Sequence, residues 1–282
     1  MTRFIDVHVH PPVPQLLEGA FATFLPDLER YFGRQFPQMD IDTLADYYAE
    51  RDGRAVLLAW DASTATGRQA FTSETVAALV ASHPERFVGF GAVDPHRGEA
   101  AVSGVHQAAQ LGLKGLKFHA PAQRFLPSER QFYSIFSAAQ ERRLICLFHS
   151  GFTGLGAGGP GGHGVRLGLG DPMHVDEVAA EFPRLRIVLA HPSWPWQDQA
   201  LAVARHKPNV YLELSGWSPK YFDTALLDAI TGPLQDRVLF GTDFPFLTPD
   251  KWLRDWEELG IPEEVSRKIL HDNAARLLEL ED

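Results

Sequence analysis

Eight short apolar runs alternate with helix-like segments along this chain, and that alternation constrains the fold more than any other feature. The runs are typical of buried strands, and the segments between them have the apolar periodicity of helices. Strands that alternate with helices pair in parallel through right-handed crossovers. Eight such units in roughly 250 residues match the size of a (β/α)8 TIM barrel, an α/β fold. The expected strands cover residues 4–10, 55–60, 87–93, 114–119, 144–149, 186–191, 210–216 and 238–243. The expected helices cover residues 43–53, 73–84, 103–112, 129–143, 175–183, 197–207 and 223–232.

Two segments lie outside the eightfold pattern. Residues 11–40 follow the first strand and are rich in proline and aromatic side chains. A connection of that length usually has a function, such as covering a site. The chain after Pro249 predicts two or three further helices. Because no repeat, low-complexity tail or linker separates these parts, we expect one domain over residues 1–282, with an inserted segment after the first strand and C-terminal helices.

The composition excludes several classes of partner. The 282 residues carry a formal net charge of −10, with a pI near 5.6, which disfavours nucleic acid and anionic membranes. No charged leader precedes an apolar stretch, and no run of about 18 apolar residues occurs, so we expect a cytoplasmic protein that acts on a small molecule. The single cysteine, Cys146, lies in the apolar run LICLFH and is expected in the core.

A glycine-rich segment, residues 149–172, contains two overlapping G-x-G-x-x-G matches that start at Gly154 and Gly156. A dinucleotide-binding turn needs a helix directly after these glycines, and Pro160 with the glycines that follow it excludes one. We therefore interpret the segment as a loop beside a site at the strand ends. Arg166 would pair there with an acidic group of the substrate, either a carboxylate or a CoA phosphate. The alternative is a flexible surface loop with Arg166 in a local ion pair.

Titratable side chains gather at the ends of the expected strands, where the active sites of (β/α)8 barrels lie. Residues two apart on a strand point to the same face, so His8 and His10 should face inward in phase with Asp6. Imidazoles and a carboxylate on one rim form a ligand set that suits Zn²⁺, with Mn²⁺ or Fe²⁺ as alternatives. A His-x-His pair alone is a modest indication of a metal site. Histidines on two further strands and an aspartate on the last strand make that indication stronger. The strand ends carry His8, His10, Lys117, His119, His149, His191 and Asp243.

The motifs IDVHVHPP, GLKGLKFHAP, LFHSG, LAHPS and LFGTDFPF follow one another along nearly the whole chain. In this order they resemble the amidohydrolase superfamily, and more closely its amidohydrolase-related, aminocarboxymuconate-semialdehyde decarboxylase-like branch. Dimers are common in that branch, so the resemblance also allows a homodimer. Carried over position by position, it implies that one divalent metal ion, Zn²⁺ ahead of Mn²⁺, is bound by His8, His10, His149 and Asp243. It further implies that His191 is catalytic beside the metal.

Lys117 lies near the end of the fourth expected strand, where binuclear members of the superfamily carry a carboxylated lysine that bridges two metal ions. The decarboxylase-like branch generally works with one metal and without this bridge, so the resemblance favours one metal ion here. Lys117 would then direct its ammonium group at a carboxylate or carbonyl of the substrate.

Two reactions suit this set of residues. A metal-bound water has a pKa near ~7, and His191 as acid or base, with Asp243 as a proton shuttle, would support hydrolysis. A hydrolase is the main expectation, because the loop after the fifth strand lacks the tryptophan-rich sequence that we associate with the decarboxylases. The alternative is a non-oxidative decarboxylase, a carboxy-lyase, that acts on an aromatic or unsaturated acid. A binding protein with an inactive site is a third interpretation, which the intact ligand set disfavours.

Aromatic residues after the last three strands suit a flat aromatic or conjugated substrate, although each of them could also pack within its own loop. These aromatic residues are Trp194, Trp196, Trp217, Tyr221, Phe244 and Phe246. The residues expected to contact a small acidic substrate are Lys117, His119, Arg166, Trp194, Trp217 and Phe244.

Overall fold

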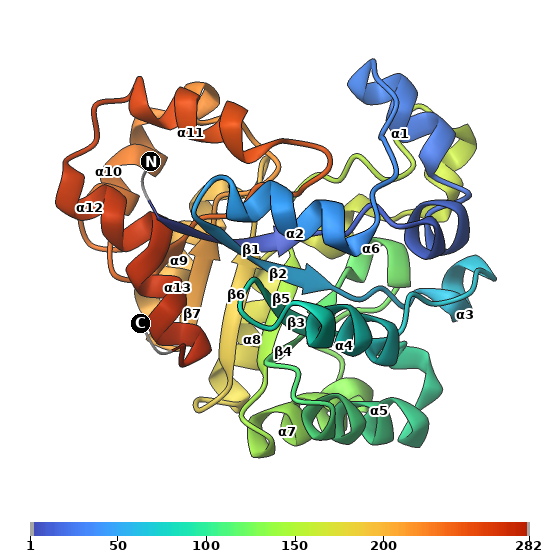
Figure 1. Ribbon diagram of the computed structural model, residues 1–282. Coiled ribbons are helices and arrows are strands. Elements are labelled where there is room, and N and C mark those ends of the chain that lie inside the picture. The colour runs from blue at the N-terminus through green and yellow to red at the C-terminus, as the bar shows by residue number, and fades with distance from the viewer. Residues whose placement is uncertain (1–2, 281–282) are drawn as a thin grey trace.

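Eight parallel strands form one sheet in chain order in the computed structural model, which describes residues 3–280 (Figure 1). Val7 N–H donates to the Phe240 carbonyl at 3.0 Å, and Asp243 N–H donates to the His8 carbonyl at 2.9 Å. These two hydrogen bonds bring the last strand back to the first and nearly close the barrel, so the predicted (β/α)8 fold is confirmed. The strands are β1 (Phe4–Val9), β2 (Gly53–Leu58), β3 (Phe87–Gly91), β4 (Gly115–Phe118), β5 (Ile145–His149), β6 (Arg186–Ala190), β7 (Val210–Glu213) and β8 (Val238–Leu239).

Helices cover the outside of the barrel where the sequence predicted them (Figure 1). Polar side chains fix several of their starts: Asp40, Thr72 and Asp223 each accept the N–H of the residue three positions on. The outer helices are α2 (Ile41–Ala49), α4 (Ser73–Ser82), α5 (Glu99–Gln110), α7 (Tyr133–Glu141), α8 (Met173–Glu181), α9 (Gln197–His206) and α10 (Thr224–Thr231). Short helices and 3₁₀ turns on the connections are α3 (Ser63–Thr66), η2 (Pro95–Arg97), α6 (Ala120–Gln123), η3 (Arg130–Phe132), η4 (Pro160–Gly164), η5 (Leu167–Gly170) and η6 (Pro219–Tyr221).

The last two strands end earlier than the sequence predicted. β7 stops at Glu213 and β8 at Leu239, whereas the apolar runs extend to residues 216 and 243. Gly216 and Asp243 have φ values of 74° and 65°, a left-handed conformation that a strand does not tolerate. The chain therefore leaves the sheet here and turns toward the rim of the barrel.

An irregularity in β1 changes which side chains share a face. The register of β1 against β2 shifts between Asp6 and Val9. Asp6 accepts hydrogen bonds from the hydroxyls of Tyr48 on α2, at 2.8 Å, and Thr242, at 2.5 Å, and it does not line the cavity described below. His8 does line that cavity. The expectation that Asp6 faces inward in phase with His8 is therefore wrong, because the shift breaks the period of two.

The segment inserted after β1 is helical and lies beside the C-terminal ends of the strands (Figure 1). It contains one π-helical turn, η1 (Gln15–Ala20), and α1 (Leu25–Phe32). Phe21, Leu28 and Phe32 from this segment reach the wall of the cavity. The segment thus covers the site, as its length suggested.

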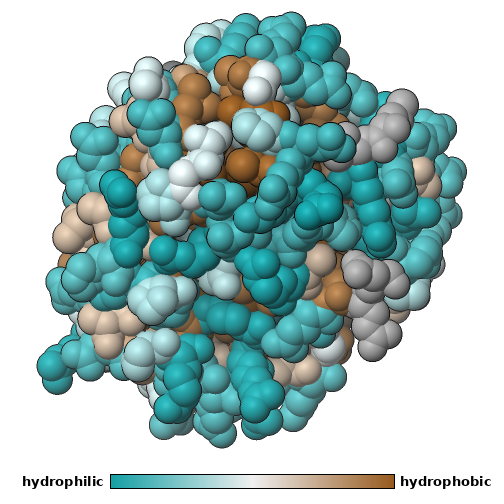
Figure 2. All heavy atoms as spheres, turned by 90° about the vertical axis from the view of Figure 1, so that its left-hand side faces the viewer, coloured by the Kyte–Doolittle hydropathy of each residue, from teal (hydrophilic) through white to brown (hydrophobic). Residues whose placement is uncertain are grey.

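The chain after β8 forms the C-terminal helices α11 (Pro249–Glu257), α12 (Glu263–Arg267), the π-helical turn η7 (Lys268–Asp272) and α13 (Asn273–Leu278). α11 packs on the outside of the barrel, where Trp252 contacts Phe240, whereas α13 lies at the end opposite the cavity. Ala274, Leu277 and Leu278 of α13 join the apolar cluster that contains Ile5 and Val7 of β1. Hydrophilic side chains cover most of the outer surface at this end (Figure 2).

The environment of the single cysteine and the character of the helices bear on two expectations from the composition. Cys146 is fully buried, as predicted, and burial raises the pKa of its thiol. Among residues 3–280, no helix combines the length and the apolar character that crossing a membrane requires.

Candidate active site

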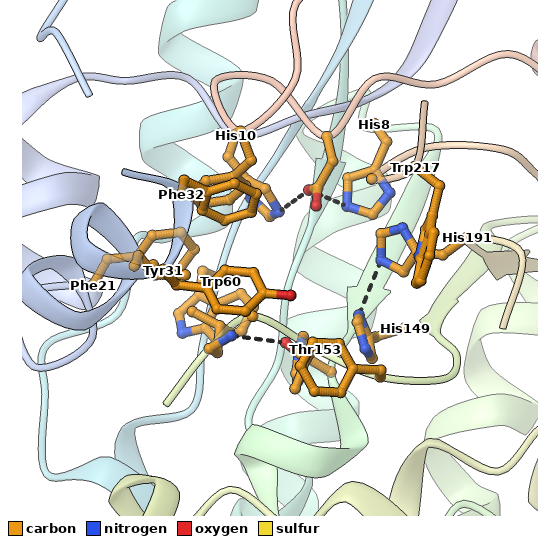
Figure 3. Close-up of a pocket in the computed structure, with 18 of the residues that line it drawn as sticks. His8, His10, Phe21, Tyr31, Phe32, Trp60, His149, Thr153, His191 and Trp217 are labelled. Carbon is orange, nitrogen blue, oxygen red and sulfur yellow. Dashed lines mark hydrogen bonds and ion pairs between the residues drawn. The ribbon is translucent and has the colours of Figure 1, made fainter. Parts of the chain in front are cut away.

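A cavity of about 260 Å³ opens at the C-terminal ends of the strands, between the barrel and the inserted segment (Figure 3). One part of its wall carries titratable groups, and the rest is largely aromatic. The titratable groups are His8, His10, Lys117, His119, His149, His191 and Asp243. The apolar and aromatic lining comprises Phe21, Leu28, Tyr31, Phe32, Trp60, Phe152, Leu155, Trp217, Tyr221 and Phe246.

Three of the predicted metal ligands converge at this cavity. Oδ1 of Asp243 lies 3.3 Å from Nε2 of His8 and 3.4 Å from Nε2 of His10. Burial alone would raise the pKa of Asp243, but the hydrogen bond from His10 and nearby positive charge lower it below the usual aspartate value. Burial also lowers the pKa values of His8 and His10, so both imidazoles are held neutral. Neutral imidazoles and an ionised carboxylate are the forms that bind a divalent cation.

Glu213 orients His8, and the sequence analysis did not single it out. Its Oε1 lies 2.6 Å from Nδ1 of His8, and its Oε2 accepts the Ser215 N–H at 2.7 Å. When Glu213 is ionised it must accept the Nδ1–H of His8, which leaves Nε2 with a lone pair that can accept from Nζ of Lys117, 3.1 Å away, or bind a cation. The available signal was a glutamate inside the apolar run VYLELSG, because a buried acid in a strand needs a partner.

Lys117 and Glu213 are two buried titratable groups that both contact His8. Burial lowers the pKa of Lys117 to about 8 and raises the pKa of Glu213 to about 8. Nζ of Lys117 lies 3.1 Å from Nε2 of His8, so it occupies the polar end of the cavity, as predicted. A divalent cation beside these groups would favour ionised Glu213, because positive charge lowers the pKa of a carboxyl group.

His149 and His191 form a hydrogen-bonded chain whose tautomers can be assigned. Nδ1 of His191 lies 3.0 Å from the Ser215 carbonyl oxygen, which can only accept, so Nδ1 carries the proton. Burial lowers the pKa of His191 to about 4, so the ring is neutral and its Nε2 accepts from Nδ1 of His149 at 3.0 Å. Nε2 of His149 is then a lone-pair acceptor, and it is buried without a partner among the described residues. An unpaired buried acceptor at this place fits a metal ligand.

His149 nevertheless lies outside the group formed by His8, His10 and Asp243, whose ligand atoms all lie within 4.8 Å of one another, and its Nδ1 is hydrogen-bonded to His191 (Figure 3). All four predicted ligands therefore line one cavity, and three of them, His8, His10 and Asp243, lie close enough together to bind one ion. The role of His149 as a fourth ligand stays a prediction.

Backbone strain marks two residues of the site. His191 and Asp243 have φ values of 69° and 65°, which cost side chains with a Cβ about 1–3 kcal/mol each. Gly216 faces them, and a Cβ there would lie 2.9 Å from Nδ1 of His191. Glycine therefore allows the end of β7 to approach His191 closely.

Three predicted substrate contacts lie off the cavity wall formed by the described residues. Phe244 follows the left-handed Asp243, and it turns away to pack against Tyr47 and Tyr48 of α2, with ring centroids 5.4 Å and 6.3 Å apart. Phe246, two residues on, lines the cavity instead. The sequence correctly placed aromatic residues after β8, but the turn at Asp243 decides which one faces inward.

Arg166 and Trp194 are the other two, and both are exposed at the surface. Trp194 is 55% exposed and packs edge-on against Phe152, beside Trp217. Arg166 belongs to the glycine-rich loop, whose other residues Gly154 and Leu155 do reach the cavity. The structure thus brings Lys117, His119 and Trp217 to the cavity wall and places Phe244, Arg166 and Trp194 outside it, so the role of these three as substrate contacts stays a prediction.

A tether joins the glycine-rich loop to the inserted segment over the cavity. Nε2 of His163 lies 2.6 Å from Oδ2 of Asp27, Arg30 also pairs with Asp27, and Arg124 donates to the His163 carbonyl at 3.0 Å. The His163 hydrogen bond, followed by Arg30, holds the pKa of Asp27 below its usual value. A depressed folded pKa means that this interaction stabilises the fold above the ordinary aspartate pKa and is lost as the pH falls through the folded value.

We expect Asp27→Ala to speed tryptic cleavage after Arg166 about two- to fivefold at neutral pH, because an ion pair of this kind contributes little to global stability but restrains the loop. The measurement is limited proteolysis followed by mass spectrometry. Asp46→Ala, an exposed aspartate on α2, is the matched control. Equal cleavage rates in the two variants would show that the tether does not restrain the loop.

Fold and site together define a class: a (β/α)8 barrel with a candidate divalent-metal centre at the C-terminal ends of its strands. The chain belongs to the amidohydrolase family, whose model matches residues 5–280. This confirms the resemblance that the strand-end motifs indicated.

Individual proteins show more distant similarity. Protein fluG of Emericella nidulans is 30% identical over 99 residues, which are 34% of this chain and 11% of that protein, so the match spans about a tenth of its length. A TIM-barrel protein from Bordetella bronchiseptica has a TM-score of 0.80 and 23% identity over 98% of each chain. A dihydroxybenzoic acid decarboxylase from Polaromonas sp. JS666, solved with bound manganese, has a TM-score of 0.71 and 21% identity over 99% of this chain and 97% of that one. At these identities the two structures show a shared fold.

Proposed function

We propose that this protein is a metal-dependent, non-oxidative decarboxylase of an aromatic or unsaturated carboxylic acid. In this reaction the bond between the carboxylate carbon and the ring or vinyl carbon breaks, CO₂ leaves, and a proton takes the vacated position. No oxidant or reductant is needed. The proposal thus favours the reaction that was the alternative in the sequence analysis.

The observation that carries the proposal is the division of the cavity wall. Lys117 is the one lysine or arginine that lines it among residues 3–280, and it lies at the end that holds Asp243 and the histidines. The rest of the wall is largely aromatic, and it adjoins the charged end through Trp60 and Phe246, whose ring centroids lie 6.2 Å and 6.1 Å from that of His10. A planar acid would place its carboxylate at the charged end and its ring against the aromatic wall. The Polaromonas protein, which acts on a dihydroxybenzoic acid, supports the same substrate class.

His8, His10 and Asp243 would hold the metal ion, with the free Nε2 of His149 as a fourth donor. The donor set fits Zn²⁺ or Mn²⁺, and manganese is bound in the Polaromonas structure. When bound, the metal supplies a Lewis acid that polarises an oxygen of the substrate.

The chain's own groups account for the rest of the chemistry. The Lys117 ammonium can neutralise the substrate carboxylate or hold, at Nζ, the proton that replaces CO₂. Phe21 and Phe32 of the inserted segment cover the cavity and exclude water, which strengthens each of these electrostatic interactions. His191 has both ring nitrogens engaged, one with Ser215 and one with His149. This arrangement favours a positioning role over the water-activating base that hydrolysis would need.

The deciding experiment measures both products. Purified protein loaded with Mn²⁺ or Zn²⁺ is incubated in D₂O with a panel of aromatic and unsaturated acids, and CO₂ and deuterium in the product are followed by mass spectrometry. We expect CO₂ release with one deuterium at the vacated carbon for at least one acid. Hydrolysis of esters, amides or lactones without any CO₂ release from the acids would overturn the proposal in favour of a hydrolase.

The contact between Glu213 and His8 gives a separate test of the metal centre. We expect Glu213→Gln to weaken Mn²⁺ affinity about 10- to 100-fold, because partners that orient a ligating imidazole typically contribute that much. Isothermal titration calorimetry measures the affinity directly. Glu258→Gln, an exposed glutamate after α11, is the control and should bind as the wild type does. Equal affinity in the two variants would mean that Glu213 does not orient a ligand.

A further inference from the structure

Thr153 is a buried hydroxyl on the cavity wall that neither the sequence analysis nor the proposed chemistry uses. It follows β5 in the glycine-rich loop and is 5% exposed. Its Oγ1 lies 3.2 Å from Nε2 of His119 and 3.1 Å from the backbone nitrogen of Leu155 (Figure 3). These two contacts determine which role the hydroxyl can play.

The tautomer of His119 is fixed by its backbone surroundings. Nδ1 of His119 accepts the Ala122 N–H at 3.1 Å, so this nitrogen carries a lone pair and no proton. The single ring proton therefore lies on Nε2, and His119 donates it to Oγ1 of Thr153.

Oγ1 of Thr153 thus accepts two hydrogen bonds, from the imidazole and from the backbone of its own loop. A hydroxyl has two lone pairs and one proton, so both acceptor positions are filled and only the O–H remains. Among residues 3–280, no acceptor lies within hydrogen-bond distance of that proton. His119 is in turn held by stacking on His149, with ring centroids 4.0 Å apart.

We propose that Thr153 is a specificity-determining residue that donates a hydrogen bond to a neutral acceptor on the ring of the substrate, such as a carbonyl, ether or hydroxyl oxygen. His119 is its positioning residue. The proposal rests on the proposed function only for the class of ligand, an aromatic acid. A donor whose acceptor positions are already filled discriminates strongly, because a ligand without an acceptor leaves a buried polar hydrogen unpaired.

The test compares ligands of equal shape. Affinities of the metal-loaded protein for ortho-, meta- and para-acetylbenzoate are measured by calorimetry beside those for the matching isopropylbenzoates, which lack the carbonyl oxygen. We expect the wild type to prefer one acetyl isomer over its isopropyl counterpart. In Thr153→Val, the affinity for that isomer should fall about tenfold while the affinity for the isopropyl ligand stays unchanged. Thr153→Ser retains the hydroxyl and should keep the preference.

Several results would overturn the proposal. One is a wild type that shows no preference for any acetyl isomer. Another is a Thr153→Val variant, folded by circular dichroism, that binds the acetyl and the isopropyl ligand more weakly by the same factor. A third is a Thr153→Ser variant that has lost the preference although it retains the hydroxyl. These binding readouts do not depend on turnover. Absence of CO₂ release from every acid would refute the decarboxylase, whereas the acetyl preference would still establish Thr153 as a donor.

Discussion

Replacing Asp243 with asparagine is expected to lower kcat/KM about 10³-fold while leaving the fold intact. The amide keeps the size of the carboxylate but removes the negative charge at Oδ1, which faces Nε2 of both His8 and His10. Loss of a charged ligand removes several kcal/mol of transition-state stabilisation, and about 4 kcal/mol corresponds to this fold-change. The measurement is steady-state decarboxylation of the acid identified in the panel, with circular dichroism and Mn²⁺ titration on the same samples.

Asp250→Asn is the matched control for that substitution. Asp250 is the second residue of α11 and pairs with Arg51, whose Nε lies 2.8 Å from its Oδ1, at the surface and away from the cavity. The same chemical change there should alter kcat/KM less than about twofold, because exposed ion pairs contribute little. If Asp243→Asn kept activity within threefold of the wild type, Asp243 would not be part of the catalytic centre.

The positions of His8, His10, His149, His191 and Asp243 could be predicted because they depend on topology alone. In a parallel barrel the C-terminal ends of all strands meet at one rim, whatever the details of packing. Residues far apart in sequence, such as His10 and Asp243, are thereby brought together. Reading the strand ends in order was enough to find them.

The residues that escaped prediction did so for different reasons. Glu213 lies within β7, paired with Leu239 of β8, and its only signal was a glutamate inside an apolar run. Asp6 turns toward Tyr48 because the register of β1 shifts, an event that a period-two pattern does not contain. Phe21 lines the cavity because of how the inserted segment folds, which no strand-based argument can describe. The chemistry of the site was thus more predictable than its substrate-facing wall.

Trp252→Ala is expected to cause the largest loss of stability, about 3–5 kcal/mol of unfolding free energy. Trp252 on α11 is fully buried, with its ring 4.7 Å from Phe240 and stacked on Trp256 at 5.1 Å. Its removal leaves a cavity between α11 and the barrel and deprives the Leu214 carbonyl of the Nε1–H bond at 3.3 Å. The expected change in Tm is about −10 °C by differential scanning calorimetry. Trp252→Phe keeps one ring and should lose less, which preserves the test if the alanine variant does not fold.

Trp194→Ala is the same substitution at an exposed site and should cost less than about 1 kcal/mol, because Trp194 is 55% exposed. The position of Trp252 also matters for activity, because Trp252 supports the end of β7. Leu214, whose carbonyl Trp252 holds, lies between Glu213 and Ser215, the two residues that contact His8 and His191. We therefore expect Trp252→Phe to lower kcat/KM at temperatures well below its Tm. Full activity in folded Trp252→Phe would mean that the end of β7 keeps its position without support from α11.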